Sequence, residues 1–307
     1  MENPAETSTA QESNPRPFVH LHCHSEYSLL DGAGSLKRLV AKAVECKMNA
    51  LALTDHGNMF GILKFYQRAK DAGIKPILGY EAYLAPDSRF NRTYTARTNS
   101  AYHLTVLAQN LTGFKNLLKM ATQAYTEGMY RKPRIDRDLL HQYGEGLIIL
   151  SGCLGGEINQ HLVNANEPNW KAAYEAAEWF QNEFGDRFYF EIQNNGIDLQ
   201  ARAARFMIEM SEKTGIPLVA TSDVHYVEKT DAPIQDILLC INTGKKRADE
   251  NRMKMGSDQF FFRNQDEMYA AFPGQEEAVA RSQEIADRCN VELELGKRFF
   301  PVFTPPD

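Results

Sequence analysis

Residues 20–32 read HLHCHSEYSLLDG and place three of the chain's eight histidines, His20, His22 and His24, at alternate positions. A period of two is the period of a β-strand, so the three side chains are expected on one face. The preceding residues, PFVH, are apolar and β-prone, which indicates a buried strand at 18–22. Buried imidazoles need polar partners. The alternatives are a solvated polar strand face or, as the sharper hypothesis, a metal site completed elsewhere in the chain.

The composition is that of a globular protein. The 307 residues are 43% hydrophobic and 24% charged, and no apolar run is long enough to cross a membrane. Five cysteines, at positions 23, 46, 153, 240 and 289, form no CxxC pair, a pattern typical of the reducing cytoplasm. The net charge of −6 excludes a uniformly basic nucleic-acid-binding protein but allows a local basic groove.

After a polar tail at residues 1–17, predicted to be disordered, short β-type runs alternate with helical patterns. Strands are predicted at 18–22, 50–53, 76–84, 102–108, 147–151, 187–192 and 217–221, and helices at 36–47, 59–72, 113–127, 135–142, 170–184 and 198–214. Repeated strand–helix units predict parallel strands joined by right-handed crossovers. The predicted α/β fold is a TIM-like (βα) barrel one unit short of eight, with a doubly wound open sheet as the alternative. Beyond residue 225 the pattern is mostly helical.

Side chains of the kind that bind metals lie at or just beyond the carboxyl ends of six of the seven predicted strands. In chain order they are His22, His24, Asp31, His56, Glu81, His103, Cys153, Asp223 and His225. Their N, O and S donors suit zinc, iron or manganese, and barrel enzymes build active sites at the carboxyl ends of strands. A single buried histidine is more often a core residue than a ligand. Six strand ends that agree favour a metal centre.

Five segments together resemble the PHP (polymerase and histidinol phosphatase) family. They are FVHLHCHSEYSLLDG (18–32), ALTDHGNMFG (52–61), GIKPILGYEAYL (73–84), SGCLGGEI (151–158) and TSDVHY (221–226). More narrowly, they resemble the family's branch at the amino terminus of the alpha subunit of bacterial DNA polymerase III, with YRKPRID (130–136) and FFPVFTPP (299–306) in the same style. The resemblance implies a distorted seven-stranded (βα) barrel, a PHP domain over residues 18–290, and a linker towards a polymerase palm over 291–307.

The resemblance also implies nine ligands for up to three divalent ions of zinc, manganese or iron. His22, His24, Glu81 and Asp223 would hold the first ion. Glu81 would bridge to a second ion, which His103 and Cys153 complete, and Asp31, His56 and His225 would hold the third. His20 lies outside this set as a core residue or a partner of the ligands, and Cys23 is expected to be a packed thiol.

The charge of such a site favours a phosphodiester. Two aspartates, one glutamate and a thiolate give −4 and three divalent ions give +6, which leaves about +2. A water activated by the metals is the expected nucleophile, with no separate protein nucleophile. The resemblance implies 3′–5′ exonuclease proofreading on single-stranded DNA ends. It implies the rest of the polymerase alpha subunit in cis and other replisome subunits as partners, and no polymerase activity in this fragment.

Two loops are candidate DNA contacts, with an ordinary solvated loop as the alternative for each. Residues 86–100 provide Arg89, Arg92 and Arg97, and residues 129–134 provide Tyr130, Arg131, Lys132 and Arg134. Two other functions stay open. One is a free-standing PHP phosphoesterase that acts on a small phosphate ester, and the other is a structural metal-binding module that stabilises the polymerase.

Overall fold

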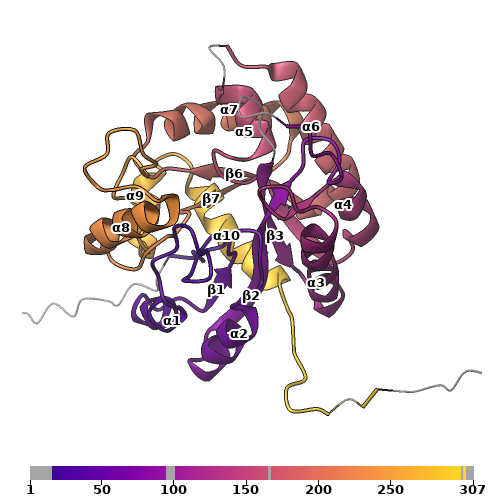
Figure 1. The fold of residues 1–307 in the computed structure, drawn as a ribbon, viewed down its shortest axis with the longest axis vertical. Helices are drawn as coiled ribbons and strands as arrows, with labels where there is room; N and C mark the ends of the chain where they lie inside the picture. Colours follow the sequence, from indigo (N-terminus) through magenta and orange to yellow (C-terminus); the bar gives the residue numbers. More distant parts are fainter. Residues whose placement is uncertain (1–15, 95–100, 165–166, 299, 302–307) are drawn as a thin grey trace, which may run out of the picture.

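A curved, mixed β-sheet with helices around its outside forms the centre of the computed structural model, which describes residues 16–94, 101–164, 167–298 and 300–301 (Figure 1). The strands are β1 (Ala50–Leu53), β2 (Lys75–Leu84), β3 (Tyr102–Ala108), β4 (Arg134–Ile135), β5 (Leu147–Leu150), β6 (Phe188–Gln193) and β7 (Leu218–Thr221). Their order is β1-β2-β3-β5-β6-β7, and the short β4 pairs with the end of β2.

The direction of β3 differs from the prediction. The pairs β1–β2, β5–β6 and β6–β7 are parallel, but β3 runs antiparallel to both β2 and β5. A parallel return needs a long crossover, usually a helix, and the described part of the β2–β3 connection contains no helix. The α/β class is confirmed. The prediction of seven regular parallel units is wrong, because the strands form a mixed sheet curled into a half-barrel.

The first predicted strand, residues 18–22, is instead an extended segment outside the regular sheet. Its backbone bonds to both ends of the strand order: Ala52 N donates to His20 O at 2.9 Å, and Val224 N donates to His22 O at 3.2 Å. A single bridge, between Cys23 and Val224, is its only regular pairing among the described residues. The segment 18–24 therefore lies between β1 and β7 without forming a ladder with either.

Helix α10 (Glu276–Arg288) accounts for the irregular start of this segment. Pro17 has no N–H to donate, and Val19 N donates to the Ser282 hydroxyl of α10 at 3.0 Å, so neither residue can begin a ladder. The same helix packs into the half-barrel. Its Ile285, Ala286 and Cys289 join an apolar cluster with Val19, Leu21, Ala50, Ala52, Ile77, Leu107, Ile148, Leu150, Tyr189 and Val219.

The remaining helices lie around the sheet (Figure 1). They are α1 (Leu36–Glu45), α2 (Ile62–Asp71), α3 (Leu111–Thr126), α4 (Arg137–Tyr143), α5 (Glu157–Val163), α6 (Trp170–Phe184), α7 (Asp198–Thr214), α8 (Ala232–Thr243) and α9 (Gln265–Ala271), with short 3-10 turns at Gly185–Arg187 and Lys229–Asp231. The six predicted helices are confirmed, and Ser35 caps the first, since Arg38 N donates to the Ser35 hydroxyl at 3.3 Å. The helix α5 was not predicted.

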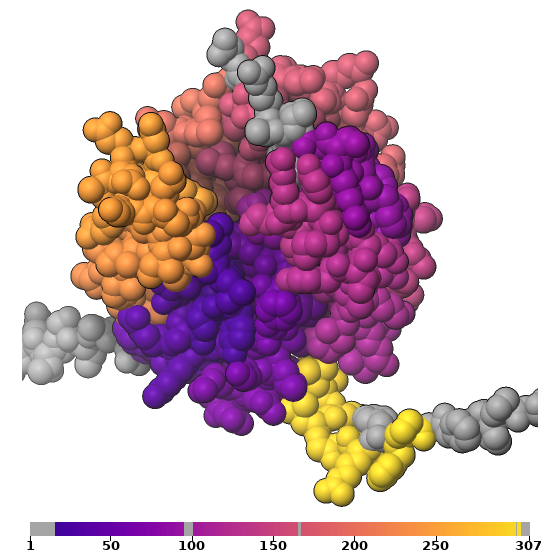
Figure 2. All heavy atoms as spheres, in the orientation of Figure 1, coloured from indigo at the N-terminus to yellow at the C-terminus, as the bar shows by residue number. Residues whose placement is uncertain are grey.

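The carboxyl-terminal region closes one side of the molecule. In Figure 2 the segment around α8 (orange) lies beside the amino-terminal segment (indigo), where Gln235 Nε2 donates to Asp31 O at 3.3 Å and Asn242 Nδ2 to Leu30 O at 3.0 Å. These bonds fix the loop that carries Asp31. Among the described residues no helix has the length and apolarity needed to span a bilayer.

Candidate metal centre

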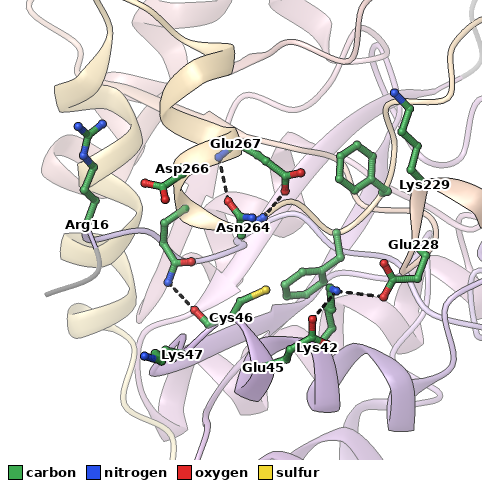
Figure 3. A pocket seen from close by; sticks show the side chains of 13 residues that line it. Arg16, Lys42, Glu45, Cys46, Lys47, Glu228, Lys229, Asn264, Asp266 and Glu267 are labelled. Atoms are coloured by element: carbon green, nitrogen blue, oxygen red, sulfur yellow. Dashed lines mark hydrogen bonds and ion pairs between the residues drawn. The ribbon is translucent and has the colours of Figure 1, made fainter. Parts of the chain in front are cut away.

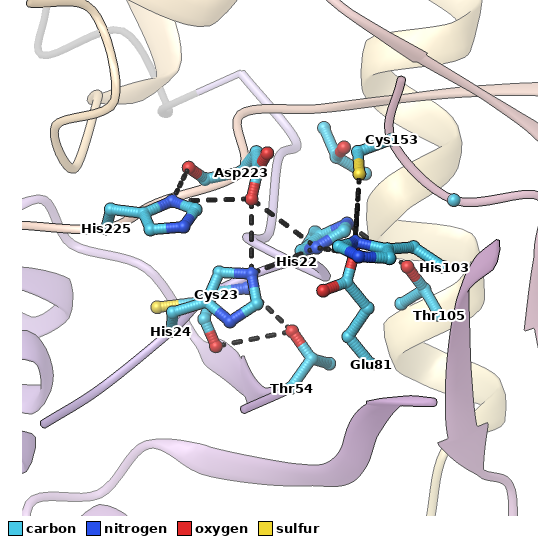
Figure 4. Close-up of polar contacts among 12 residues, drawn as sticks. His22, Cys23, His24, Thr54, Glu81, His103, Thr105, Cys153, Asp223 and His225 are labelled. Carbon is cyan, nitrogen blue, oxygen red and sulfur yellow. Dashed lines mark hydrogen bonds and ion pairs between the residues drawn. The ribbon is translucent and has the colours of Figure 1, made fainter. Parts of the chain in front are cut away.

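All nine predicted ligand side chains meet at one end of the half-barrel. The segment 18–24 provides His22 and His24, and the loop that follows it provides Asp31. Glu81 lies in β2 and His103 in β3. The loops after β1 and β5 provide His56 and Cys153, and the loop after β7 provides Asp223 and His225. Figure 4 shows side chains from distant parts of the sequence pointing toward one another. Apolar residues and α10 fill the interior of the half-barrel behind them.

Two of the nine positions differ from the prediction. His103 is the second residue of β3 rather than a residue at a carboxyl end. Because β3 is antiparallel to its neighbours, its amino end lies at the same edge of the sheet as their carboxyl ends. Glu81 lies within β2, and not beyond it. The ligand set still gathers at one edge of the sheet, because β3 runs in the opposite direction and has its ligand near its amino end.

Three of the side chains form a first group around Asp223. His24 Nε2 lies 3.1 Å from both His22 Nε2 and Asp223 Oδ1, and His22 Nε2 lies 3.5 Å from the same carboxylate oxygen. Asp223 has a φ of 51°, in the left-handed region that residues other than glycine rarely adopt. Such strain persists where the surrounding structure imposes it, often at functional sites.

Glu81 joins a second group. Its Oε1 lies 2.9 Å from His103 Nδ1, 3.3 Å from His22 Nε2 and 3.4 Å from Cys153 Sγ. Its other oxygen, Oε2, forms an ion pair with His56 Nδ1. The Glu81 side chain is fully buried, so each of its oxygens depends on these partners. Glu81 is thus the residue that connects the groups, as the predicted bridging role requires.

The third group surrounds Asp31. His56 Nε2 lies 3.3 Å from Asp31 Oδ1, and His225 Nε2 lies 3.7 Å from Asp31 Oδ2. The rings of His24 and His56 stack with centroids 4.0 Å apart, which brings the third group against the first. The nine side chains therefore form one continuous cluster.

The donor set fits divalent metal ions. Three subsets have ligand atoms that all lie within 4.8 Å of one another: His22–His24–Asp223, His56–Glu81–His103 and His24–His56–His225. Asp31 Oδ1 and Glu81 Oε2 are buried and accept no hydrogen bond from any described residue, although both lie against imidazole nitrogens. Buried carboxylate oxygens normally have hydrogen-bond partners, so these two atoms have capacity left for a cation.

Three imidazoles of the cluster favour their protonated form, which puts positive charge beside the carboxylates. Burial lowers the pKa values of His22, His56 and His225, but the neighbouring carboxylates outweigh it and raise all three. Burial likewise raises the pKa of Asp31 and Glu81, yet the adjacent imidazoles lower both well below their usual range. Burial and the Glu81 charge raise the pKa of the Cys153 thiol. A bound metal would displace these protons as the counter-charge of the carboxylates.

Glu191 in β6 is a functional candidate that sequence reasoning missed. Its Oε1 lies 2.6 Å from His22 Nδ1, which leaves His22 Nε2 facing the cluster. It also accepts hydrogen bonds from the hydroxyls of Thr221 (2.5 Å) and Thr105 (3.0 Å) and from Gly152 N (3.1 Å). A glutamate within the apolar strand FYFEIQ was the available signal, because a buried charge must have a partner.

Asp55, next to His56, was also missed. It accepts hydrogen bonds from Ser25 N at 2.7 Å and from the Ser28 hydroxyl at 2.8 Å, and the Ser28 hydroxyl lies 3.1 Å from His24 Nδ1. Asp55 therefore fixes the turn between His24 and Asp31. As with Glu191, a carboxylate orients an imidazole, here through one hydroxyl.

His20 and Cys23 lie outside the cluster, as predicted. His20 Nε2 donates to Arg263 O at 2.8 Å, and its ring packs between Phe18 and Phe262. Burial lowers the pKa of His20 to about 4, so this core imidazole is neutral. Cys23 belongs to the main apolar core, and burial raises the pKa of its thiol.

Arg134 was predicted to contact DNA, and the structure contradicts this. The residue is 0% exposed, and its guanidinium donates to Gly128 O at 3.1 Å, Arg89 O at 2.9 Å and Asn91 O at 2.8 Å. A buried guanidinium whose donors point at backbone carbonyls is not available to a phosphate. Its role is to hold residues 89–91 against the 128–134 loop.

The other predicted DNA contacts divide by exposure. The Arg89 side chain is mostly buried and pairs with Glu127 and Asp136, whereas Arg92 and Arg131 are exposed. Lys132 and Tyr130 are partly buried, and Tyr130 donates its hydroxyl proton to Tyr94 O at 2.8 Å. Arg97 lies outside the described residues.

A cavity of about 870 Å³ lies away from the predicted ligands, between the end of α1, the Lys229–Asp231 turn and α9 (Figure 3). Arg16, Lys42, Lys47 and Lys229 line it together with Glu45, Glu228, Asp266 and Glu267. Lys42 pairs with both Glu45 and Glu228, at 2.8 and 3.0 Å. The four basic and four acidic side chains of the cavity therefore balance in charge, and the cavity has no feature that selects a phosphate or a metal.

Comparison with known protein families shows to which family this chain belongs. The pattern of the PHP domain matches residues 20–195, a stretch that includes seven of the nine predicted ligands. The chain belongs to the PHP family. This PHP domain is also similar in sequence to the DNA polymerase III alpha subunits of Treponema pallidum, at 47% identity over 94% of the chain, and of Borreliella burgdorferi, at 46% over 89%.

Those relatives are much longer than the PHP domain, which spans 24% of the length of each. Among solved structures, the domain is similar to a histidinol phosphate phosphatase from Lactococcus lactis complexed with zinc, L-histidinol and phosphate. The TM-score is 0.38 at 11% identity, over 75% of this chain and 94% of that one. An amidohydrolase from Chromobacterium violaceum gives a TM-score of 0.43 at 14% identity, over 68% and 87% of the two chains.

Proposed function

We propose that this PHP domain is a metal-dependent phosphodiesterase that removes nucleotides from the 3′ end of single-stranded DNA, as the proofreading domain of a replicative polymerase alpha subunit. The observation that supports it most is the gathering of nine N, O and S donors into one cluster with no ligand position lost. The alpha-subunit relatives add the context, since a domain beside a polymerase meets frayed 3′ ends.

Divalent ions, when bound, polarise a phosphodiester and make water a competent nucleophile near neutral pH. The protein's own residues hold the ligands in place for that chemistry. Glu191 keeps the Nε2 atom of His22 directed into the cluster, and Ser28, fixed by Asp55, does the same for His24. No serine or cysteine nucleophile is needed, and the Cys153 thiol serves as a ligand.

The exposed side of the cluster indicates where a substrate would enter. The side chains of His22, His24 and Glu81 are 0% exposed, whereas that of His103 is 27% exposed and that of His56 is 13% exposed. A phosphodiester would therefore approach past His103 and His56. Tyr83, whose ring centroid lies 5.3 Å from that of His103, stands at this entrance.

The test is incubation of the manganese- or zinc-loaded domain with single-stranded DNA labelled at its 5′ end. We expect a ladder that shortens from the 3′ end, and its loss in the double variant His22→Ala, Asp223→Asn. The control is His141→Ala, which removes an exposed imidazole that pairs with Glu183, at 3.0 Å, away from the cluster. An inactive wild-type protein that retains its metals would contradict the proposal.

A second candidate is a structural metal module that stabilises a polymerase. The burial of His22, His24 and Glu81 favours it, because structural sites are closed while catalytic sites keep an open position. Metal removal separates the two candidates. A structural site would unfold the domain on chelation, whereas the catalytic site would lose hydrolysis while the fold persists, as measured by circular dichroism.

A further inference from the structure

An apolar groove beside the metal centre has exposed aromatic side chains. The cavity, of about 370 Å³, lies between residues 58–60 and the outer face of α3. Phe60 is 58% exposed and Tyr125 39% exposed, and their ring centroids lie 5.9 Å apart at 46°. We call Phe60, Tyr125 and Leu118, which lines the same groove, the aromatic shelf. Large apolar side chains left in water next to one another usually mark a contact surface.

A short, rigid connection joins the aromatic shelf to a predicted metal ligand. Phe60 follows His56 by four residues. Between them, the buried Asn58 donates its amide to both Tyr27 O and His56 O at 2.9 Å, and its oxygen accepts from Phe60 N at 3.0 Å. The position of Phe60 is therefore fixed relative to His56.

Two cationic residues, Arg131 and Lys132, belong to the loop that touches Gly57. A Cβ atom placed on Gly57 would be 2.6 Å from the Tyr83 ring and 3.1 Å from Pro133, so the 57–60 and 130–133 loops touch. Lys132 Nζ lies 3.2 Å from the Tyr83 hydroxyl. Arg131 is exposed at the tip of this turn, with a φ of 61°. The strand of a nucleic acid could thus place phosphates on Lys132 and Arg131 and a base on the shelf.

We propose that the aromatic shelf binds an unpaired base of the DNA strand whose terminal phosphodiester lies at the metal centre, an inference that rests on the proposed function. Every base offers a flat π-face, so stacking on aromatic rings is tolerant of sequence. The groove lining is mainly apolar and offers few groups that could select one base, which suits an enzyme that must remove any terminal nucleotide. The nearby cations and metal ligands favour a nucleic acid over an apolar protein segment as the occupant.

The experiment uses the metal-loaded 307-residue protein and a single-stranded oligodeoxynucleotide with 2-aminopurine near its 3′ end and phosphorothioate terminal linkages. Stacking quenches 2-aminopurine, so fluorescence reports base contact, anisotropy reports binding and gel shortening of an unmodified strand reports hydrolysis. We expect quenching by the wild-type protein and by Phe60→Trp. We expect lost quenching and about tenfold weaker binding in Phe60→Leu and Tyr125→Leu.

Phe300→Leu is the matched control, because Phe300 is an exposed phenyl ring, at 82%, that lies outside the groove and outside both candidate DNA loops. It should bind and quench as the wild-type protein does. Three results would each contradict base binding at the shelf and leave the groove to a protein partner: equal losses in Phe300→Leu, quenching that Phe60→Leu leaves intact, or no binding of the oligonucleotide. Quenching that depends on Phe60 but is not accompanied by hydrolysis would support base binding at the shelf and contradict the proposed exonuclease activity.

Discussion

His22 illustrates how one side chain outside the ligand set decides the behaviour of a ligand. Its Nδ1 faces Glu191 at 2.6 Å, and only Nε2 is left to face the cluster. A carboxylate at that distance selects the tautomer, fixes the ring and raises its basicity. Four donors besides His22, on Thr221, Thr105, Gly152 and Gln193, hold the Glu191 carboxylate itself in place.

Substitution of Glu191 by Gln tests this arrangement. The amide keeps the size of the side chain but loses its charge, so we expect metal affinity to fall about 10–100-fold. Competition with a chromophoric chelator measures the affinity. Glu183→Gln is the matched control, because it alters the carboxylate of a carboxylate–histidine pair outside the cluster. Equal affinities in Glu191→Gln and the wild-type protein would contradict the positioning role.

His20 predicts a pH dependence of stability. Its folded-state pKa is lowered to about 4, below the ordinary 6.5, because burial disfavours the charged form. The unfolded chain therefore binds a proton between pH 6.5 and 4 that the folded chain does not, and stability falls as the pH falls through this window. The expected loss from this residue between pH 7 and pH 5 is about 2 kcal/mol.

Urea unfolding of the wild-type protein and of His20→Gln at pH 7 and pH 5 measures this effect. The other histidines are common to both proteins, so the difference between their pH dependences isolates His20. The variant should lose about 2 kcal/mol less than the wild-type protein over this range. Parallel pH dependences would show that His20 is not the neutral core residue described.

At the level of elements, sequence patterns predicted local structure well and pairing poorly. The strands β1 and β3 begin and end as predicted at 50–53 and 102–108, and the helices α6 and α7 match 170–184 and 198–214, because periodicity and caps are local signals. The direction of β3 and the irregular backbone at 18–22 depend on partners far along the chain. The ligand types could be predicted because they stand out at strand ends, whereas Glu191 sits inside an apolar strand.

The loop 128–134 gives a prediction of its own, because it contains one structural arginine and one exposed arginine. Arg134→Met would remove the guanidinium donor of Arg89 O and Asn91 O, whereas Gly128 O would keep the backbone donor Arg134 N at 3.3 Å. We expect a loss of about 2–4 kcal/mol in the free energy of unfolding. Arg131→Ala should leave stability nearly unchanged. If the Arg131 guanidinium contacts a phosphate, the Arg131→Ala variant should show a salt dependence of DNA binding that is smaller by about one unit of log–log slope.

Urea unfolding and titrations with DNA at several salt concentrations measure the two effects. Lys37→Ala, on α1, serves as a control for removal of a cation elsewhere. A reduced salt slope in a folded Arg134→Met protein would restore this residue as a DNA contact.

For the whole molecule, bound metal is expected to stabilise the fold by joining the two ends of the sheet. The ligands come from the segment 18–24, from β2 and β3 and from the loops after β1, β5 and β7, so ions bound among them join both ends of the strand order. A metal at 100 times its Kd adds about 2.7 kcal/mol of stability, which should raise Tm by roughly 5 °C. Thermal unfolding with and without chelator measures the shift.

Asp223→Asn tests whether the shift comes from this cluster, because it weakens one ligand without changing the size of the side chain. Its Tm should respond less to added metal than that of the wild-type protein. A wild-type Tm that is insensitive to saturating metal would mean that the ions do not couple the two ends of the sheet.

The position of the segment 18–24 has a consequence for synthesis on the ribosome. The segment is translated before its partners, and His24 meets Asp223 across a sequence separation of 199 residues. At about 5–20 residues per second, roughly 10–40 s pass before that partner is translated. During this time three histidines and a thiol are exposed on an unpaired extended strand. The nascent chain must therefore keep this segment from pairing elsewhere until its partners have been translated.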